Sequence, residues 1–438
     1  MKKALIITYY WPPAGGGGVQ RVAKFCKYLP ELGWEPVVLT VANGNYPAQD
    51  ESLLAEVAQI EKVYRAPSLE PHVLYNGLAR LVKRAPKGRS GSENATSDRG
   101  PSRLHRLGEL VRLNLFVPDS RIGWRRSARR KGLEIIAREQ PDLIFSSSPP
   151  YTPHLIASDL KKVTGLPWVV DFRDPWLENH AYNTAPRLGF IKQWNRKLET
   201  RVLQKADHVL AANPGIKNFA MMKLGEDQQG KFQVITNGYD VEDVRPAIRP
   251  LPRFTVSYYG TVYPQGFPME LFEGMRELID ADPAFAGDFH FRIIGSISPN
   301  VRASVEQTVP ATNLTVSDYI PHSDMIDQLY ETQALVVVLN DFVNNHVYAP
   351  GKIYEYLPSG NPILGIGPAN GDAAALLAQT QAGVMLNYGD KDGIKQFLID
   401  QYAKWKGGTL SKGPVGYPPF ERQHLTRELA DVFNRLTA

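Results

Sequence analysis

Cysteine and long hydrophobic runs are nearly missing from this sequence of 438 residues. Its single cysteine, Cys26, excludes an internal disulfide and a cysteine-based zinc site. No apolar stretch approaches the ~20 residues that a membrane-spanning helix requires. The N-terminal run MKKALIITYYWPP is too short for a signal peptide with a cleavage site. We therefore expect a cytoplasmic protein, and peripheral attachment to the inner membrane face stays open.

Two phosphate-binding fingerprints are also missing, although the first apolar run leads into four consecutive glycines. The dinucleotide-binding spacing would require a glycine at Gln20 or Arg21, and no acid ends the second expected strand. The Gly-Lys-Ser/Thr sequence of a P-loop does not follow the glycines either. Glycines that lead into a helix still favour an anionic ligand, because the backbone N–H groups can approach it closely. These glycines are Gly15, Gly16, Gly17 and Gly18.

Short apolar runs alternate with helical patterns along almost the whole chain, which is typical of parallel sheets with helical crossovers. The runs are near-continuously apolar, as in strands that are covered on both faces. This pattern predicts an α/β protein with two doubly wound Rossmann-like domains that face a cleft. The expected strands are 4–9, 36–41, 142–147, 168–172, 208–212, 232–236, 255–260, 289–295, 314–320, 334–340, 362–366 and 383–386.

The alternation restarts after a proline-rich stretch at 241–253, where we place the domain linker. We expect one domain over 1–240, a second over 253–415, and a terminal helix over 420–438 that packs back on the first domain. Residues 84–103 are polar and rich in glycine and serine, which predicts a disordered basic insertion in the first domain.

Basic residues are concentrated around this insertion, although the net charge of the whole chain is only +5. The segment Arg121–Lys131 places several arginines on an expected helix, together with Trp124. A solvated helix face is one interpretation, and a surface for anionic lipid headgroups or a polyanionic acceptor is the other. We expect no nucleic-acid partner, since no recognition motif accompanies the charge.

The first turn of the helix after the glycines contains Arg21 and no acid. Asp or Glu normally occupies this turn, because a cation there is disfavoured by the helix dipole. Two explanations stay open at this stage. Either an anionic ligand lies beside Arg21, or its side chain reaches into solvent, at a cost of only ~0.3–1 kcal/mol.

A cation in the first turn of an expected helix occurs again in the second half of the chain. Pro350 and Gly351 mark the start of a helix, and Lys352 lies in its first turn. Glu355 follows three residues later, on the same helix face. An exposed ion pair is one interpretation. In the other, Lys352 holds a diphosphate and Glu355 binds ribose hydroxyls.

Several motifs along the chain together resemble the family 4 glycosyltransferases, most closely those of bacterial surface polysaccharides. This resemblance covers nearly the whole chain and implies the two-domain GT-B fold and a nucleotide-sugar donor. The matching stretches are YYWPPAGGGGVQRVAKF, DFRDPW, VITNGYD, SYYGTVYPQGF and GKIYEYLPSGNPIL.

The resemblance implies transfer of a sugar to an acceptor hydroxyl, with retention of configuration and without a metal ion or other cofactor. The first domain would be the acceptor side, and the second would bind the donor. Lys352, Glu355, Arg21 and Asp174 would be the catalytic residues. The donor would contact Gly15 to Gly18, Gly260, Thr261, Ile320, Pro321, His346, Tyr348 and Gly351. Arg173 and Asp171 would line the acceptor side, where the acceptor is a glycan or a lipid-linked sugar.

Two departures from the family pattern leave alternatives open. The family usually has two glutamates in an E-x7-E spacing, and here Val347 occupies the first position. The loop GTVYPQGF also lacks the cations that usually face the diphosphate. Asn345 or His346 is a candidate for the first function, and Lys352 for the second. A nucleotide-sugar epimerase of the same fold and an inactive scaffold protein remain the alternatives.

Overall fold

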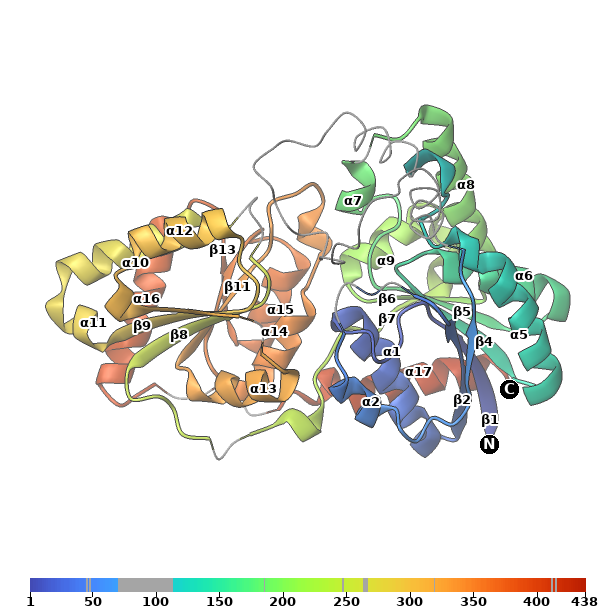
Figure 1. The fold of residues 1–438 in the computed structure, drawn as a ribbon, viewed down its shortest axis with the longest axis horizontal. Coiled ribbons are helices and arrows are strands. Elements are labelled where there is room, and N and C mark those ends of the chain that lie inside the picture. Colours follow the sequence, from blue (N-terminus) through green and yellow to red (C-terminus); the bar gives the residue numbers. More distant parts are fainter. Residues whose placement is uncertain are drawn as a thin grey trace, which may run out of the picture. The chain divides into compact units, whose positions relative to one another are not determined.

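The protein is described by a computed structural model, in which residues 1–44, 46, 49–69, 113–184, 186–245, 248–262, 267–318, 320–410, 413 and 416–438 are described. The expected insertion at 84–103 lies outside these residues. Contacts divide the chain into two compact units (Figure 1). The first unit comprises Met1–Ile235 with Thr426–Ala438, and the second comprises Thr236–Leu425.

The first unit is built on a parallel sheet, which has seven strands within the described residues, in the order β3-β2-β1-β4-β5-β6-β7. β1 lies at the centre, where Ala4 pairs with Pro36 of β2 and with Leu143 of β4. The chain reverses its direction of strand addition between β1 and β4. In such sheets, ligands bind in the crevice at the carboxyl ends of these two strands. The strands are β1 (Lys2–Ile7), β2 (Trp34–Val41), β3 (Val63–Ala66), β4 (Leu143–Ser148), β5 (Trp168–Phe172), β6 (His208–Ala211) and β7 (Phe232–Val234).

Two successive residues of β4 show which helices cover each face of this sheet. Phe145 contacts Phe25 of α1 and Phe433 of α17, whereas the next residue, Ser146, bonds to His154 of α6. Successive side chains of a strand point to opposite faces, so α1 and α17 cover one face and α6 covers the other. The helices are α1 (Gly17–Tyr28), α2 (Ser52–Glu56), α5 (Arg125–Glu139), α6 (Thr152–Thr164), α7 (His180–Asn183), α8 (Gly189–Lys205), α9 (Pro214–Met221) and α17 (Arg422–Leu436).

The second unit repeats this topology with the strand order β10-β9-β8-β11-β12-β13. Its reversal point lies between β8 and β11, which pair in parallel with Val256 opposite Ala334. The strands are β8 (Phe254–Tyr259), β9 (Phe289–Ile294), β10 (Leu314–Ser317), β11 (Ala334–Val338), β12 (Ile363–Ile366) and β13 (Gly383–Leu386). The helices are α10 (Met269–Ala281), α11 (Pro283–Asp288), α12 (Pro299–Thr308), α13 (His322–Glu331), α14 (Gly351–Tyr356), α15 (Asp372–Thr380) and α16 (Lys391–Lys406).

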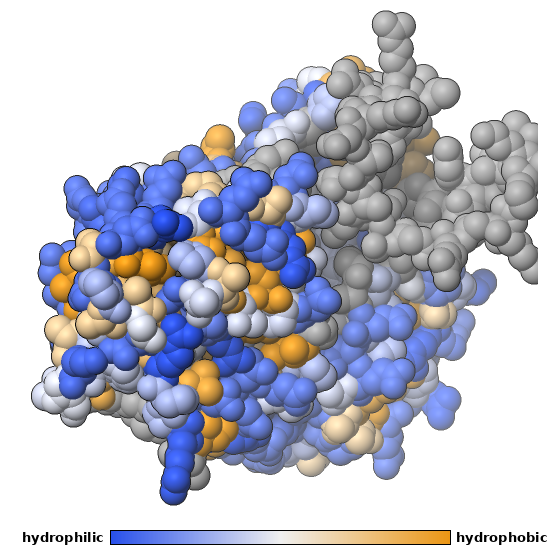
Figure 2. Space-filling model, turned by 60° about the vertical axis from the view of Figure 1, so that its left-hand side comes forward, coloured by the Kyte–Doolittle hydropathy of each residue, from blue (hydrophilic) through white to orange (hydrophobic). Residues whose placement is uncertain are grey.

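Two apolar clusters cover the two faces of the second sheet. One contains Phe254, Val256 and Phe291, and the other contains Tyr259, Leu335 and Val337. The strands are thus buried on both sides, which explains their continuous apolar sequence. On the surface of the second unit, apolar residues lie interspersed among hydrophilic ones (Figure 2).

The α/β fold class predicted from the sequence is confirmed, and the twelve expected strands occur within three residues of their predicted bounds. β3 was missed, because its four residues VYRA carry Arg65 at the sheet edge and form no apolar run. The boundary between the units falls at Ile235 and Thr236, before the proline-rich stretch. Tyr239 explains this difference, since it packs in the second unit and its N–H bonds to Phe420 O at 3.0 Å. Among the described helices, none has the length and apolar character needed to cross a bilayer.

Candidate functional site

The glycine loop joins the carboxyl end of β1 to α1, beside the reversal point of the first sheet. Gly16 lies just before α1 at φ 99°, a conformation that strongly favours glycine, and its position is exposed. The first turn of α1 contains no acid, and no side chain caps the helix. α6 also begins beside this point, but its first N–H groups donate to the carboxylate of Asp119, at 2.7 Å from Tyr151 and 3.0 Å from Thr152. The start of α1 is therefore the better candidate for an external anion.

Arg21 is fully buried and paired with a carboxylate of the protein itself. Its Nη2 lies 2.8 Å from Oδ1 of Asp171 on β5, and Nε lies 3.2 Å from Oδ2. Nη2 also donates to Ile235 O at 2.8 Å, and Ser147 Oγ donates to Asp171 Oδ2 at 2.7 Å. The explanation that Arg21 reaches into solvent was wrong, because the side chain is buried and the anion beside it is Asp171 of the protein itself. A direct contact of Arg21 or Asp171 with substrate stays a prediction that this burial does not favour.

Hydrogen bonds of the Arg173 side chain link the glycine loop to the end of β4. Its guanidinium donates to the carbonyl oxygens of Gly18, Ser148 and Pro149, the second at 2.9 Å from Nε. A Cβ atom at Gly18 would lie 2.5 Å from Nη1, so a side chain there would displace the guanidinium. Arg173 therefore holds the start of α1, rather than presenting its charge freely to an acceptor.

Asp174 differs from these residues, because its carboxylate accepts no hydrogen bond from the described part of the chain. Burial raises the pKa of Asp174, and the neighbouring Arg173 opposes this shift. The side chain is half-buried and follows the carboxyl end of β5. Of the four residues predicted on the acceptor side, Asp174 is the one available for an external hydroxyl.

Lys352 lies at the reversal point of the second sheet, in the first turn of α14. Its Nζ donates to Tyr259 O at 2.8 Å and lies 4.9 Å from the centre of the Tyr258 ring. Burial lowers the pKa of Lys352 to about 8, although the charge of Glu355 acts in the opposite direction. The ammonium group is thus poorly solvated in the resting protein, and a nearby anion would stabilise it.

Gly260 makes this position of Lys352 possible. It directly follows β8 at φ 134°, and a Cβ atom there would lie 2.3 Å from the Lys352 Nζ. The backbone conformation favours glycine, and a side chain there would displace the Lys352 ammonium group. The structure thus brings together Gly260 and Lys352, which the sequence predicted as donor-site residues from segments far apart in the chain.

Glu355 has its own partners and does not form the exposed ion pair with Lys352 that the sequence left open. Its Oε1 lies 3.8 Å from His322 Nε2, and its side chain is half-buried. Burial opposes ionisation, but His322, Arg422 and Lys352 together lower the pKa of Glu355. His322 and Arg422 were missed, since no local pattern links them to a glutamate on another helix.

The loop before α14 contains Val347 at the position of the first family glutamate. Val347 is buried, and its side chain packs away from solvent. Asn345 Nδ2 donates to Asn340 O at 3.1 Å and to Tyr388 Oη at 2.9 Å, so this amide is used within the loop. His346 is exposed and remains the better candidate for a donor contact. Tyr348 is half-buried, with its ring 5.4 Å from that of Phe342.

The remaining predicted donor residues lie at the same edge of the second sheet. Thr261 follows Gly260 and is exposed. Ile320 is half-buried against the apolar cluster of Tyr259, and Pro321 is exposed immediately before α13. These positions agree with a site at the carboxyl edge, and their contacts with a ligand stay a prediction.

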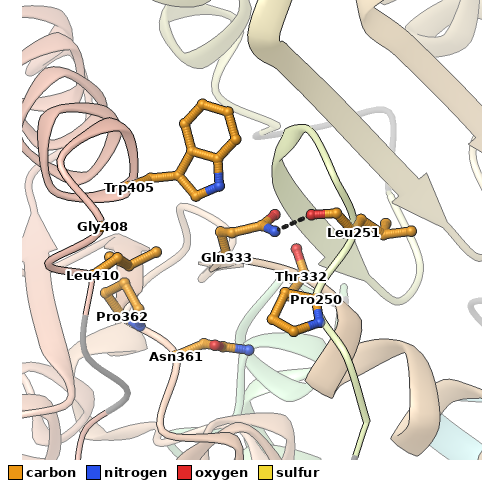
Figure 3. A pocket seen from close by; sticks show the side chains of 9 residues that line it. All are labelled: Pro250, Leu251, Thr332, Gln333, Asn361, Pro362, Trp405, Gly408 and Leu410. Carbon is orange, nitrogen blue, oxygen red and sulfur yellow. Dashed lines mark hydrogen bonds between the residues drawn. The ribbon is translucent and has the colours of Figure 1, made fainter.

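A pocket of about 210 Å³ opens at the opposite edge of the second unit (Figure 3). Six of its nine residues directly precede β8, β11 or β12, so it lies at the amino ends of these strands. Gln333 Nε2 donates to Leu251 O at 2.7 Å across it, and Asn361 Nδ2 donates to Leu329 O at 2.7 Å. Ligand pockets usually measure ~300–1,000 Å³ and lie at the carboxyl ends of such sheets. This pocket is therefore separate from the candidate site.

A family model described as "Glycosyl transferase 4-like domain" matches residues 16–238, about half of the chain. The chain belongs to this family. The matched residues include Gly16 to Gly18 of the glycine loop, the buried Arg21–Asp171 pair and Asp174. No curated protein matches the sequence.

Solved structures that resemble this one cover nearly the whole chain at low sequence identity. HepE of Anabaena, in complex with UDP-glucose, has a TM-score of 0.62 at 12% identity over 99% of this chain and 100% of its own. Sucrose-phosphate synthase of Thermosynechococcus elongatus has a TM-score of 0.61 at 12% identity, over 100% of this chain and 99% of its own. UDP-GlcNAc 2-epimerase of Neisseria meningitidis, bound to UDP-GlcNAc, has a TM-score of 0.54 at 10% identity over 99% and 100%. These likenesses confirm the GT-B fold.

Proposed function

We propose that the protein transfers a sugar from a nucleoside diphosphate sugar to an acceptor hydroxyl, with retention and without a metal ion. The observation that carries this proposal is the poorly solvated Lys352 ammonium group, held against Gly260 at the reversal point of the second sheet. Membership of the glycosyl transferase 4-like family supports sugar transfer. The UDP-glucose bound by the similar HepE structure supports a nucleotide-sugar donor.

Lys352 would stabilise the diphosphate as it leaves. Negative charge develops on the bridging oxygen when the glycosidic bond breaks, and a fixed cation there lowers the barrier. Loss of one such contact costs ~2.7–4 kcal/mol in other enzymes, or about a hundredfold to a thousandfold in turnover. The Lys352 Nζ would exchange its bond to Tyr259 O for a phosphate oxygen, which better compensates the charge.

Other residues at the same edge would orient the donor. Glu355, held ionised by His322 and Arg422, would accept hydrogen bonds from ribose hydroxyls. The backbone of Gly260, Thr261 and Gly351 would lie along the diphosphate. We assign the base to the backbone at Ile320 and Pro321, and the donor sugar to His346 and Tyr348.

In the first unit, Asp174 is the residue we propose to contact the acceptor, because its carboxylate is not used by the described protein atoms. Arg21, Asp171 and Arg173 would act as positioning residues, since their charges are committed to the glycine loop and its supports. The acceptor would be a glycan or a lipid-linked sugar, in the synthesis of a bacterial surface polysaccharide on the cytoplasmic side of the membrane. The sequence resemblance supports this finer assignment.

A thermal-shift panel with UDP, GDP, dTDP, CMP, ADP and NAD tests the donor site. A ligand at a hundred times its Kd should stabilise the protein by about 2.7 kcal/mol. We expect one nucleoside diphosphate to raise Tm in the wild type, and a much smaller rise in Lys352→Met. No shift with any of the six compounds would favour the inactive scaffold instead.

A nucleotide-sugar epimerase is the second candidate, since a 2-epimerase is among the proteins with this fold. It would release an altered nucleotide sugar without any acceptor. Analysis of the nucleotide products by mass spectrometry and NMR separates the two activities. Free nucleoside diphosphate supports the transferase, and an isomerised nucleotide sugar supports the epimerase.

A further inference from the structure

An apolar surface is exposed at the start of α8 in the first unit. The side chains of Leu188, Phe190 and Trp194 are 48%, 65% and 51% exposed. Leu115, 68% exposed, follows Asn114, whose Oδ1 accepts a bond from Leu188 N at 2.7 Å, so the backbone at 114–115 lies near this surface. Large apolar side chains that gather in this way mark an interaction site.

Two cationic residues follow the aromatic residues along one face of α8. Phe190, Trp194, Lys197 and Arg201 follow the spacing i, i+4, i+7 and i+11, which places them on one face. All four are exposed. We call these four residues, with Leu115 and Leu188, the α8 surface. The face that packs on the protein carries Ile191, Asn195, Leu198 and Val202, all buried.

Exposed negative charge is missing from this helix. Residues 186–205 contain six Lys or Arg residues and one carboxylate, Glu199. Glu199 is buried, and its Oε1 accepts a bond from Lys223 Nζ at 2.6 Å. In the described part of the chain, Lys192, Lys197 and Arg201 form no ion pair with a carboxylate. A second copy of the protein would bring this cationic helix against itself, so the charge favours an anionic partner.

We propose that the α8 surface docks the first unit onto an anionic lipid bilayer. The leucines and aromatic rings would enter the headgroup region, and Lys197 and Arg201 would contact lipid phosphates. Aromatic and leucine side chains beside Lys and Arg are the composition of helices that lie in a membrane interface. The proposal does not depend on the activity proposed above.

The place of α8 in the fold adds to this argument. α8 precedes β6 and therefore begins at the carboxyl edge of the sheet, the edge at which the glycine loop lies. Docking there would bring the first unit's candidate site to the lipid surface, where a lipid-linked acceptor is found.

α5 contributes charge but no apolar anchor. It lies beside α6, which in turn contacts α8 (Figure 1). Arg126, Arg129 and Arg130 are exposed on α5. Trp124, however, is fully buried and donates through Nε1 to Ala66 O at 3.1 Å. The segment Arg121–Lys131 would therefore supply cations to a membrane surface, whereas the side chains that would enter the headgroup region belong to the α8 surface.

Trp194 provides a built-in reporter for this proposal. Five of the seven tryptophans are buried, namely Trp11, Trp34, Trp124, Trp168 and Trp176, and Trp405 is half-buried. Insertion should thus shift the emission of Trp194 to shorter wavelength. The test adds the full-length protein to phosphatidylcholine vesicles with and without about 30% phosphatidylglycerol, and measures emission and co-sedimentation. We expect a shift and co-sedimentation with the anionic vesicles, and no emission shift in Trp194→Phe.

Three further variants separate the contributions. The double variant Phe190→Ser/Trp194→Ser should lose co-sedimentation, and Lys197→Gln/Arg201→Gln should bind about 25-fold more weakly, at about fivefold per cation. Val163→Ser serves as the control, because Val163 is 58% exposed at the distant end of α6. Urea unfolding should show that all variants fold equally well. The proposal would be overturned if the wild type did not co-sediment with the anionic vesicles. It would also be overturned if the Phe190→Ser/Trp194→Ser variant co-sedimented as well as the wild type. A Trp194 shift that depends on protein concentration without vesicles would overturn it as well.

Discussion

The lowered pKa of Lys352 predicts how nucleotide binding changes with pH. Burial holds the pKa at about 8 in the free protein. A bound diphosphate would raise it, because an opposite charge close by favours the ammonium form. Only the protonated fraction of the free protein then binds tightly. This fraction is about 90% at pH 7 and about 10% at pH 9, so Kd should rise about tenfold over this range.

Isothermal titration calorimetry with the nucleoside diphosphate identified in the thermal-shift panel measures this effect. At pH 8, binding of the nucleotide should be coupled to the uptake of about half a proton. This proton number is obtained by comparing binding enthalpies measured in buffers with different heats of ionisation. Two other groups at the donor site titrate outside this window. The terminal phosphate titrates near pH 6, and burial raises the pKa of Tyr259 to about 12.

Lys352→Met is the matched control, since methionine keeps much of the side-chain volume and cannot be protonated. Its Kd should be weaker at pH 7 and nearly constant between pH 7 and 9. A wild-type Kd that stays constant over this range would refute the reasoning. The same slope in wild type and Lys352→Met would show that another group takes up the proton.

Three further variants test the supports of the site and the buried charges. Arg21→Met leaves the buried Asp171 carboxylate without its cation, so urea unfolding should show a loss of about 3–5 kcal/mol, against less than about 0.5 kcal/mol for the exposed Arg129→Met; equal stability of the two variants would contradict this account. Gly260→Ala should weaken nucleotide binding measured by calorimetry, because alanine is strained at φ 134° and its Cβ atom, 2.3 Å from the Lys352 Nζ, would displace that ammonium group, whereas Gly287→Ala, with open space around it, should bind normally. Burial raises the pKa of Glu199 to about 7, so the free energy of unfolding should fall as the pH rises from about 4.5 to above 7, and Glu199→Gln should lose this slope in urea titrations at several pH values. Identical pH profiles for wild type and Glu199→Gln would show that Glu199 titrates normally.

The strands could be predicted from the sequence because both sheets are buried on both faces. The run 334–339, for example, is apolar at every position, and this requirement is local. β3 lies at the sheet edge, where Arg65 can reach solvent, and so its sequence carried no such signal.

The candidate site was predictable only where its residues share one short segment. Lys352 and Glu355 lie three residues apart on one helix, and their spacing was sufficient to pair them with a single site. Their partners, Tyr259 O and His322, come from other elements and depend on the folded sheet. Arg21 shows the same limit, since its carboxylate partner lies 150 residues away on β5.

The exposure of individual tryptophan side chains could not be predicted from the sequence either. Trp124 and Trp194 both lie beside arginines and lysines, yet one is fully buried and the other is half exposed. The difference arises from packing, because Trp124 fills the space next to β3 and bonds to Ala66 O. Charge density alone therefore indicated α5, and the structure was needed to find the apolar residues of α8.

Release of nucleoside diphosphate from a nucleotide sugar is the measurement that tests the central claim most directly. The purified protein would be incubated with UDP-, GDP- and dTDP-sugars and a glycan or lipid-linked acceptor, and the freed nucleotide counted by chromatography. We predict acceptor-dependent release from one donor, reduced about a hundredfold to a thousandfold in Lys352→Met. Equal release by wild type and Lys352→Met, or an isomerised nucleotide sugar without free nucleoside diphosphate, would contradict the account.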